Sequence, residues 1–65
     1  MHVTQYYIEG IKEAREIYNQ HGYLCPEIEA QSFKELARRH SGAMKDFFKG
    51  QYDFWKNQAK REAKL

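Results

Sequence analysis

The chain has 65 residues, of which 42% are hydrophobic, 15% aromatic and 31% charged, and its formal net charge is +2. Such a chain forms one small domain at most, placed at residues 1–65, and its apolar fraction argues against disorder. The single cysteine, Cys25, excludes a disulfide within the chain. Because the sequence has no long apolar run, we expect neither a membrane span nor a signal peptide. We therefore expect a cytoplasmic protein stabilised by a helical core, self-association or a partner.

The first predicted helix covers residues 4–21. Thr4 is its expected N-cap, and Gly22 is its expected C′ residue with a positive φ. Gly10 lies inside the helix, where glycine costs about 1 kcal/mol relative to alanine, and we expect it to allow a close approach by another backbone. Apolar side chains recur at helical spacing along one side, at Tyr7, Ile8, Ile11, Ala14, Ile17 and Tyr18.

The second predicted helix covers residues 26–40. Pro26 suits the first position of a helix, whereas the Ser32 and Glu35 pair has capping-box spacing and offers an alternative start after Ser32. We prefer the start at Pro26. His40 is expected at the C-terminal end, where a partly protonated ring suits the helix dipole. The predicted apolar side consists of Ile28, Phe33, Leu36 and Ala37.

The third predicted helix covers residues 43–63, after Ser41 as a cap. Gly50 falls on its polar side, where we expect it to weaken the helix without disturbing packing. Four lysines form a stripe along one flank, at Lys45, Lys49, Lys56 and Lys60. Rotation by about 100° per residue gathers the apolar and amide side chains in one broad arc, formed by Met44, Phe47, Phe48, Gln51, Tyr52, Phe54, Trp55, Gln58 and Ala59.

The fold class that follows is all-α. No run of alternating β-branched residues and no Asn-Gly or Asp-Gly hairpin turn indicates a strand. We expect a small three-helix bundle, with the helices packed either antiparallel or as an orthogonal trio.

The sequence contains no constellation that is typical of an active site or a metal site. Cys25 has no recognisable base and no glycine-rich loop beside it, so a buried structural thiol is the preferred interpretation. His2, His21 and His40 stand about twenty residues apart, unlike the close ligand pairs of zinc sites. We predict no catalytic residue, no metal and no cofactor, and hence a protein that is not an enzyme.

Binding to another protein is the preferred function. Five tyrosines, four phenylalanines and one tryptophan are too many large rings for three short helices to cover, so some should be exposed. Tyr6, Tyr52 and Phe54 are the predicted interface residues, whereas Trp55 is more central and is expected in the core. Such a module would be a regulatory accessory subunit, an adaptor or an inhibitor, and its partner another protein or a second copy of itself.

Nucleic-acid binding is the alternative, because charge is divided unevenly along this small basic protein. Residues 1–32 contain two basic and five acidic residues, whereas residues 33–65 contain nine basic and four acidic ones. Residues 33–60 resemble a helix-turn-helix in order, although few of their side chains could read base edges. Contacts to phosphate would come from Arg38, Arg39, Lys45, Lys49, Lys56 and Lys60.

Overall fold

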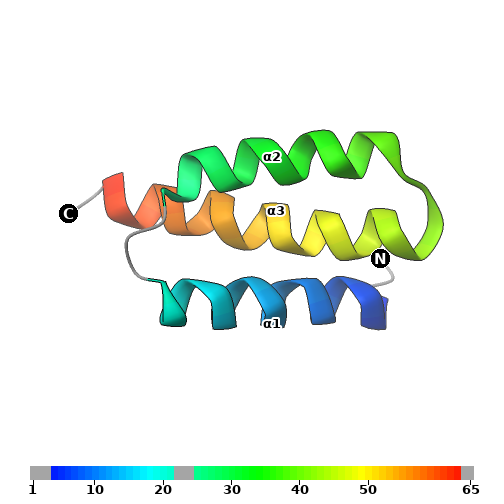
Figure 1. Cartoon of the computed structure of the whole chain (residues 1–65), viewed down its shortest axis with the longest axis horizontal. Helices are drawn as coiled ribbons and strands as arrows, with labels where there is room; N and C mark the ends of the chain where they lie inside the picture. Colours follow the sequence, from blue (N-terminus) through cyan, green and yellow to red (C-terminus); the bar gives the residue numbers. More distant parts are fainter. Residues whose placement is uncertain (1–3, 22–24, 64–65) are drawn as a thin grey trace.

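The computed structural model describes residues 4–21 and 25–63, and these form three helices. They are α1 (Gln5–Gln20), α2 (Pro26–Arg39) and α3 (Gly42–Ala63) (Figure 1). All three lie within one residue of the predicted bounds at each end, and the described residues contain no strand. The all-α fold class is therefore confirmed.

Local capping signals fix the helix ends. The side-chain oxygen of Thr4 accepts a hydrogen bond of 3.3 Å from the backbone N–H of Tyr7, as an N-cap does. Pro26 is the first residue of α2, so the alternative start after Ser32 is wrong. His40 is the C-cap of α2, as expected. The predicted C′ residue of α1, Gly22, lies outside the described residues.

Helix α3 occupies the centre of the molecule. In Figure 1, α2 lies along one side of α3 and α1 along the other, and the described parts of α1 and α2 pack against α3 rather than against each other. Helices α1 and α3 run in the same direction, whereas α2 runs in the opposite one. The chain is thus a three-helix bundle, with principal extents of 35 × 22 × 19 Å, in which each flanking helix has one helical neighbour.

The hydrophobic core centres on Trp55. Its side chain has 0% exposure and packs with Ala14 of α1 and Ala30 of α2, which confirms the prediction that Trp55 is a core residue. The ring of Tyr18 meets it edge-on, with the centroids 5.9 Å apart. Towards the other end of α2, Phe33 stacks on Phe48 at 6.1 Å. Small residues from the two outer helices therefore allow one large ring to fill the space between them.

Two glycines bring α1 and α3 into backbone contact. A Cβ atom on Gly10 would overlap the carbonyl oxygen of Phe47, and a Cβ atom on Gly50 would overlap the carbonyl oxygen of Tyr7. The close approach expected at Gly10 is therefore confirmed. The interpretation of Gly50 is wrong, because this residue is buried in the contact rather than lying on an outward polar side.

Three apolar residues that the sequence pattern placed among core-facing positions are largely exposed, and one of them is Ile8 on α1, at 45%. Ile28 on α2 is 64% exposed, and Met44 in the first turn of α3 is 49% exposed. The reason for Ile28 is the arrangement of the helices: within residues 4–21 and 25–63, α2 packs against α3 alone, so it buries a narrow stripe through Pro26 and Ala30. At about 100° per residue, Ile28 lies nearly opposite both. The outer side of α2 thus carries apolar surface that the core does not use.

Candidate functional site

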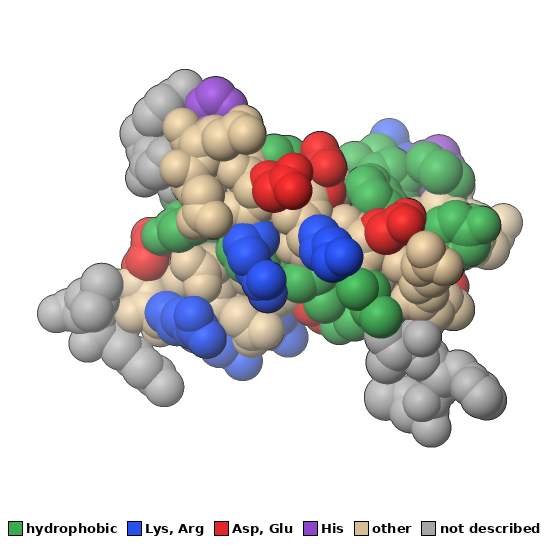
Figure 2. Space-filling model, turned by 90° about the horizontal axis from the view of Figure 1, so that it is seen from below, with side chains coloured by type: hydrophobic (Ala, Val, Ile, Leu, Met, Phe, Trp, Pro, Cys, Tyr) green, Lys and Arg blue, Asp and Glu red, His purple; other side chains and the backbone are tan. Residues whose placement is uncertain are grey.

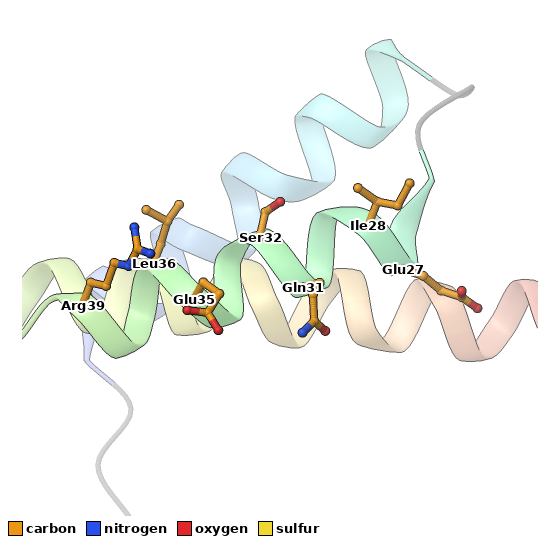
Figure 3. Close-up of a pocket in the computed structure, with 7 residues that line it drawn as sticks. All are labelled: Glu27, Ile28, Gln31, Ser32, Glu35, Leu36 and Arg39. Carbon is orange, nitrogen blue, oxygen red and sulfur yellow. The ribbon is translucent and has the colours of Figure 1, made fainter.

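The outer face of α2 is an open surface with apolar residues in it. Ile28, Ser32 and Leu36 follow one another at intervals of four residues and project along one edge of the helix in Figure 3. Glu27, Gln31 and Glu35 project along the other edge. Together with Arg39 these side chains line a shallow hollow of about 730 Å³. We call this surface the α2 outer face: Glu27, Ile28, Gln31, Ser32, Glu35, Leu36 and Arg39.

Charge is polarised along α2. Glu27 and Glu29 lie in its first turn, and Arg38 and Arg39 lie in its last turn. Both sets oppose the partial charges of the helix ends and so stabilise α2, by typically 0.3–1 kcal/mol per residue at exposed sites. Arg38 forms an ion pair of 3.2 Å with Glu35, and both side chains are exposed, so this pair contributes little. The helix therefore presents an acidic and a basic end to solvent.

The three predicted interface rings have different environments. Tyr6 is 52% exposed. Phe54 is partly buried and makes edge contacts with Tyr18 at 6.1 Å and Trp55 at 5.3 Å. Tyr52 is also partly buried against the core, and the Lys56 ammonium lies 5.6 Å from its ring centroid. Their role in binding stays a prediction, and Tyr6 is the one of the three that presents most of its ring to solvent.

Sequence reasoning missed Ile28 as a candidate contact residue. The apolar residues of α2 were grouped into one stripe, whereas the structure divides them between an inner stripe of small residues and the outer face. A usable signal was present, because Ile28 is two residues from Pro26 and from Ala30 and cannot share their side of a helix. Alanine contributes only a weak signal to a hydrophobic pattern, although small residues allow two helices to pack most closely.

The basic residues of the alternative hypothesis are exposed but do not form a helix-turn-helix. Helices α2 and α3 lie antiparallel along their length (Figure 1), whereas the helices of that motif cross at about 90–120°. The expected helix-turn-helix likeness is therefore wrong. Lys45, Lys49, Lys56 and Lys60 do share one flank of α3. Figure 2 shows basic side chains in the middle and lower left of one face, with most acidic side chains above them.

Three hydroxyl groups of the α1 segment donate hydrogen bonds to carboxylates of α3. Thr4 donates to Asp46 at 3.0 Å, and Tyr18 donates to Glu62 at 2.7 Å. Tyr7 donates to Asp53. The hydrogen bond to Asp53, with burial and the negative charge of that carboxylate as smaller causes, raises the pKa of Tyr7 to about 12. The hydrogen bond to Glu62 likewise raises the pKa of Tyr18.

The Tyr7 hydrogen bond predicts an alkaline loss of stability. Because the pKa of Tyr7 rises from 10.0 to about 12 on folding, its contribution is fully present below pH 10 and is lost as pH rises through about 12. Tyr7→Phe should flatten part of this fall, and the rest should persist through Tyr18. Urea unfolding of both proteins across this pH range measures the difference. Identical pH profiles for the two proteins would contradict the assignment to Tyr7.

Other kinds of site find little support in the described residues. No group of three or more His, Cys, Asp or Glu side chains in residues 4–21 and 25–63 is placed to hold a metal ion. None of the three helices, as far as they are described, is both long and apolar enough to cross a bilayer. Cys25 is exposed at the N-cap of α2, so the expectation of a buried thiol is wrong.

Comparisons of the chain with protein-family models, with curated proteins and with solved structures found no match.

Proposed function

We propose that this chain is a small non-enzymatic protein-binding module, such as an accessory subunit, an adaptor or an inhibitor. Its contact surface is the α2 outer face. The observation that carries the proposal is Ile28, which is 64% exposed beside Ser32 and in line with Leu36, with charged residues around it. An apolar centre with a charged rim is the usual composition of a protein interface.

Energetics favour burial of this surface by a partner. Fully burying an isoleucine or leucine side chain contributes about 1.5–3 kcal/mol relative to leaving it exposed. The fold of the monomer leaves most of that contribution unused at Ile28, because the outer side of α2 faces away from α3. A partner helix laid along α2 would cover Ile28 and Leu36 together, because both side chains project along the same edge of α2.

Tyr6 offers a second exposed ring, on α1. It stays a predicted contact residue, as do Tyr52 and Phe54. Because Phe54 touches Trp55, we expect its truncation to lower stability as well as any binding. Variants of Tyr6 are therefore cleaner probes of an aromatic contact than variants of Phe54.

The test of the proposal compares two isoleucines in equivalent places. Ile28 lies in the first turn of α2 and Ile8 in the first turn of α1, where glutamate suits the helix dipole and should preserve folding. With the chain as bait in a cell extract, Ile28→Glu should abolish the capture of protein partners. Ile8→Glu, which is also at an exposed position, should retain it.

The fold of both variants is checked by circular dichroism before capture is compared. A partner that is held equally by wild type and Ile28→Glu would contradict the α2 outer face as the contact surface. Loss of capture in both variants would point instead to general destabilisation, and the thermal midpoint of each variant separates that case.

Binding of a polyanion is the second candidate, and the lysine stripe favours it. Lys45 and Lys60 are fifteen residues apart, so the stripe extends over about 22 Å of α3. Within the described residues none of its four lysines forms an ion pair. If six basic residues contacted phosphate, affinity for nucleic acid would fall about 10³-fold or more between low and moderate salt. Absence of DNA and RNA binding at low salt would exclude this candidate.

A further inference from the structure

Another hollow, of about 240 Å³, lies between α1 and α3. Its lining residues come from both helices, and none of them belongs to the α2 outer face. We propose that this hollow binds a small phosphate monoester, whose phosphate group is held between Arg15 of α1 and Arg61 of α3. The site goes beyond the proposed function, because it uses a different surface and a different kind of ligand.

The register of the two helices brings the arginines to one end of the hollow. Helices α1 and α3 run in the same direction (Figure 1), and Tyr7 of α1 donates a hydrogen bond to Asp53 of α3. Arg15 is eight residues after Tyr7, and Arg61 is eight residues after Asp53. Both arginines therefore lie about 12 Å further along the bundle than the Tyr7–Asp53 contact. Since all four residues line the hollow, the two guanidinium groups enter it from its two walls at a similar level.

The arginine end of the hollow has no carboxylate partner. Within the described residues, neither Arg15 nor Arg61 forms an ion pair, and Arg61 donates only to the amide oxygen of Gln58, at 3.5 Å. The carboxylates of Asp53 and Glu62 accept hydrogen bonds from tyrosine hydroxyls of α1, and of these two only Asp53 lines the hollow, at its other end. Two guanidinium groups in one hollow repel each other, so an anion between them would stabilise both.

The number of donors favours phosphate over carboxylate. A single guanidinium fork already occupies both oxygens of a carboxylate, whereas a phosphate monoester offers three terminal oxygens and a charge of about −1.5 to −2 at neutral pH. Asn57 and Gln58 add amide groups beside the two forks. Both arginines and both amides can therefore contact one phosphate group, and a carboxylate would leave part of this set unused.

The remaining lining limits the ester group. Ile11 and Phe54 give the hollow an apolar part, which suits an aliphatic or aromatic group rather than a sugar. Its volume of about 240 Å³ lies below the range of about 300–1,000 Å³ that is usual for drug-sized ligands. The ligand class is thus a phosphate joined to one short apolar group.

The surroundings of the hollow favour the approach of an anion. Figure 2 is seen from the α1 side of the bundle, and basic side chains gather in the middle and lower left of this face. Such a cluster attracts anions over several ångströms of solvent. Arg15 and Arg61 are themselves exposed, so a ligand can reach them without any movement of the helices.

Titration of the full, ¹⁵N-labelled chain with phenyl phosphate tests the site. We expect saturable amide shifts around the hollow, with a Kd of about 1 mM at constant ionic strength. Arg15→Gln and Arg61→Gln should each weaken binding about tenfold, because each removes charge-assisted hydrogen bonds. Lys12→Gln is the matched control: it removes the same charge from an exposed position of α1 outside the hollow and should change the Kd by less than about twofold.

Two further comparisons separate specific recognition from general attraction. Arg15→Lys keeps the charge but loses the planar fork, so it should bind phenyl phosphate nearly as weakly as Arg15→Gln. Benzoate and inorganic phosphate should both bind wild type more weakly than phenyl phosphate, since the first lacks the third oxygen and the second lacks the apolar group. Circular dichroism of each variant checks that the fold is retained.

The absence of saturable shifts up to about 10 mM phenyl phosphate would overturn the inference. So would equal weakening by Lys12→Gln and Arg15→Gln, which would reduce the effect to net charge. If benzoate or inorganic phosphate bound as tightly as phenyl phosphate, the assigned ligand class would be wrong. The proposed function is tested separately, because Ile28→Glu should leave phenyl phosphate binding unchanged and Arg15→Gln should leave the capture of a protein partner unchanged.

Discussion

Gly50→Ala is expected to destabilise the protein by about 3 kcal/mol, the upper range for an overpacked contact. The sign is opposite to that of the same change in an exposed helix, where alanine is favoured by about 1 kcal/mol. An added Cβ atom would overlap the carbonyl oxygen of Tyr7 and lie 3.1 Å from its carbonyl carbon and 3.2 Å from the backbone nitrogen of Ile11. These are backbone atoms of α1, so relief requires the two helices to separate.

Thermal and urea unfolding followed by circular dichroism measure this effect. For a domain of this size, each kcal/mol shifts the melting temperature by about 4–8 °C, so the change is well resolved. Lys49→Ala is the matched control, because it is the exposed neighbour on the same turn and should change stability little. Gly10→Ala should resemble Gly50→Ala, since it meets Phe47 in the same way. A Gly50→Ala protein more stable than wild type would show that the two backbones are not in contact.

The helices could be predicted from the sequence because their ends depend on neighbouring residues. Thr4 caps α1 through its own side chain, and Pro26 begins α2 by its fixed φ. Gly42, with φ of 64°, lies at the start of α3, where the chain turns back after His40. Each of these signals acts within a few residues, so a single sequence is sufficient to read it.

The contact between α1 and α3 could not be located from the sequence in the same way. A glycine has no side chain and gives no hydrophobic signal, so the pattern of α3 assigned Gly50 to the polar side. Its burial is decided by the position of α1, which lies on the side of α3 away from α2 (Figure 1). The sequence suggested a close approach at Gly10 but could not name the backbone that approaches it.

The exposed apolar surface of α2 could not be located from the sequence either. Periodicity marks which residues of α2 are apolar, but it cannot say whether one or two helices will cover them. Because α1 and α2 lie on opposite sides of α3, α2 packs against α3 through a stripe of small residues, and Ile28 stays exposed to solvent. The exposed apolar surface is thus a consequence of the order of the helices in space, which depends on contacts distant in the sequence.

Trp55→Ala is expected to cost about 3–5 kcal/mol, which is a large part of the stability of so small a domain. A domain of this length has a total stability of about 3–10 kcal/mol, at roughly 0.05–0.15 kcal/mol per residue. Trp55 is the largest fully buried side chain among the described residues and joins Ala14 of α1 to Ala30 of α2. Neither alanine can fill the space that its removal leaves, and α1 and α2 would lose their shared neighbour.

Trp55→Phe separates the volume of the ring from its polar nitrogen. The indole nitrogen is buried and has no hydrogen-bond partner among the described residues, so phenylalanine removes an unpaired donor while it keeps an aromatic ring. We expect this variant to remain folded and to lose less than half as much stability as Trp55→Ala. Circular dichroism in urea gives both values, because it does not depend on the tryptophan. If Trp55→Ala proved nearly as stable as wild type, the three helices would have to be held together elsewhere, and a core centred on Trp55 would be wrong.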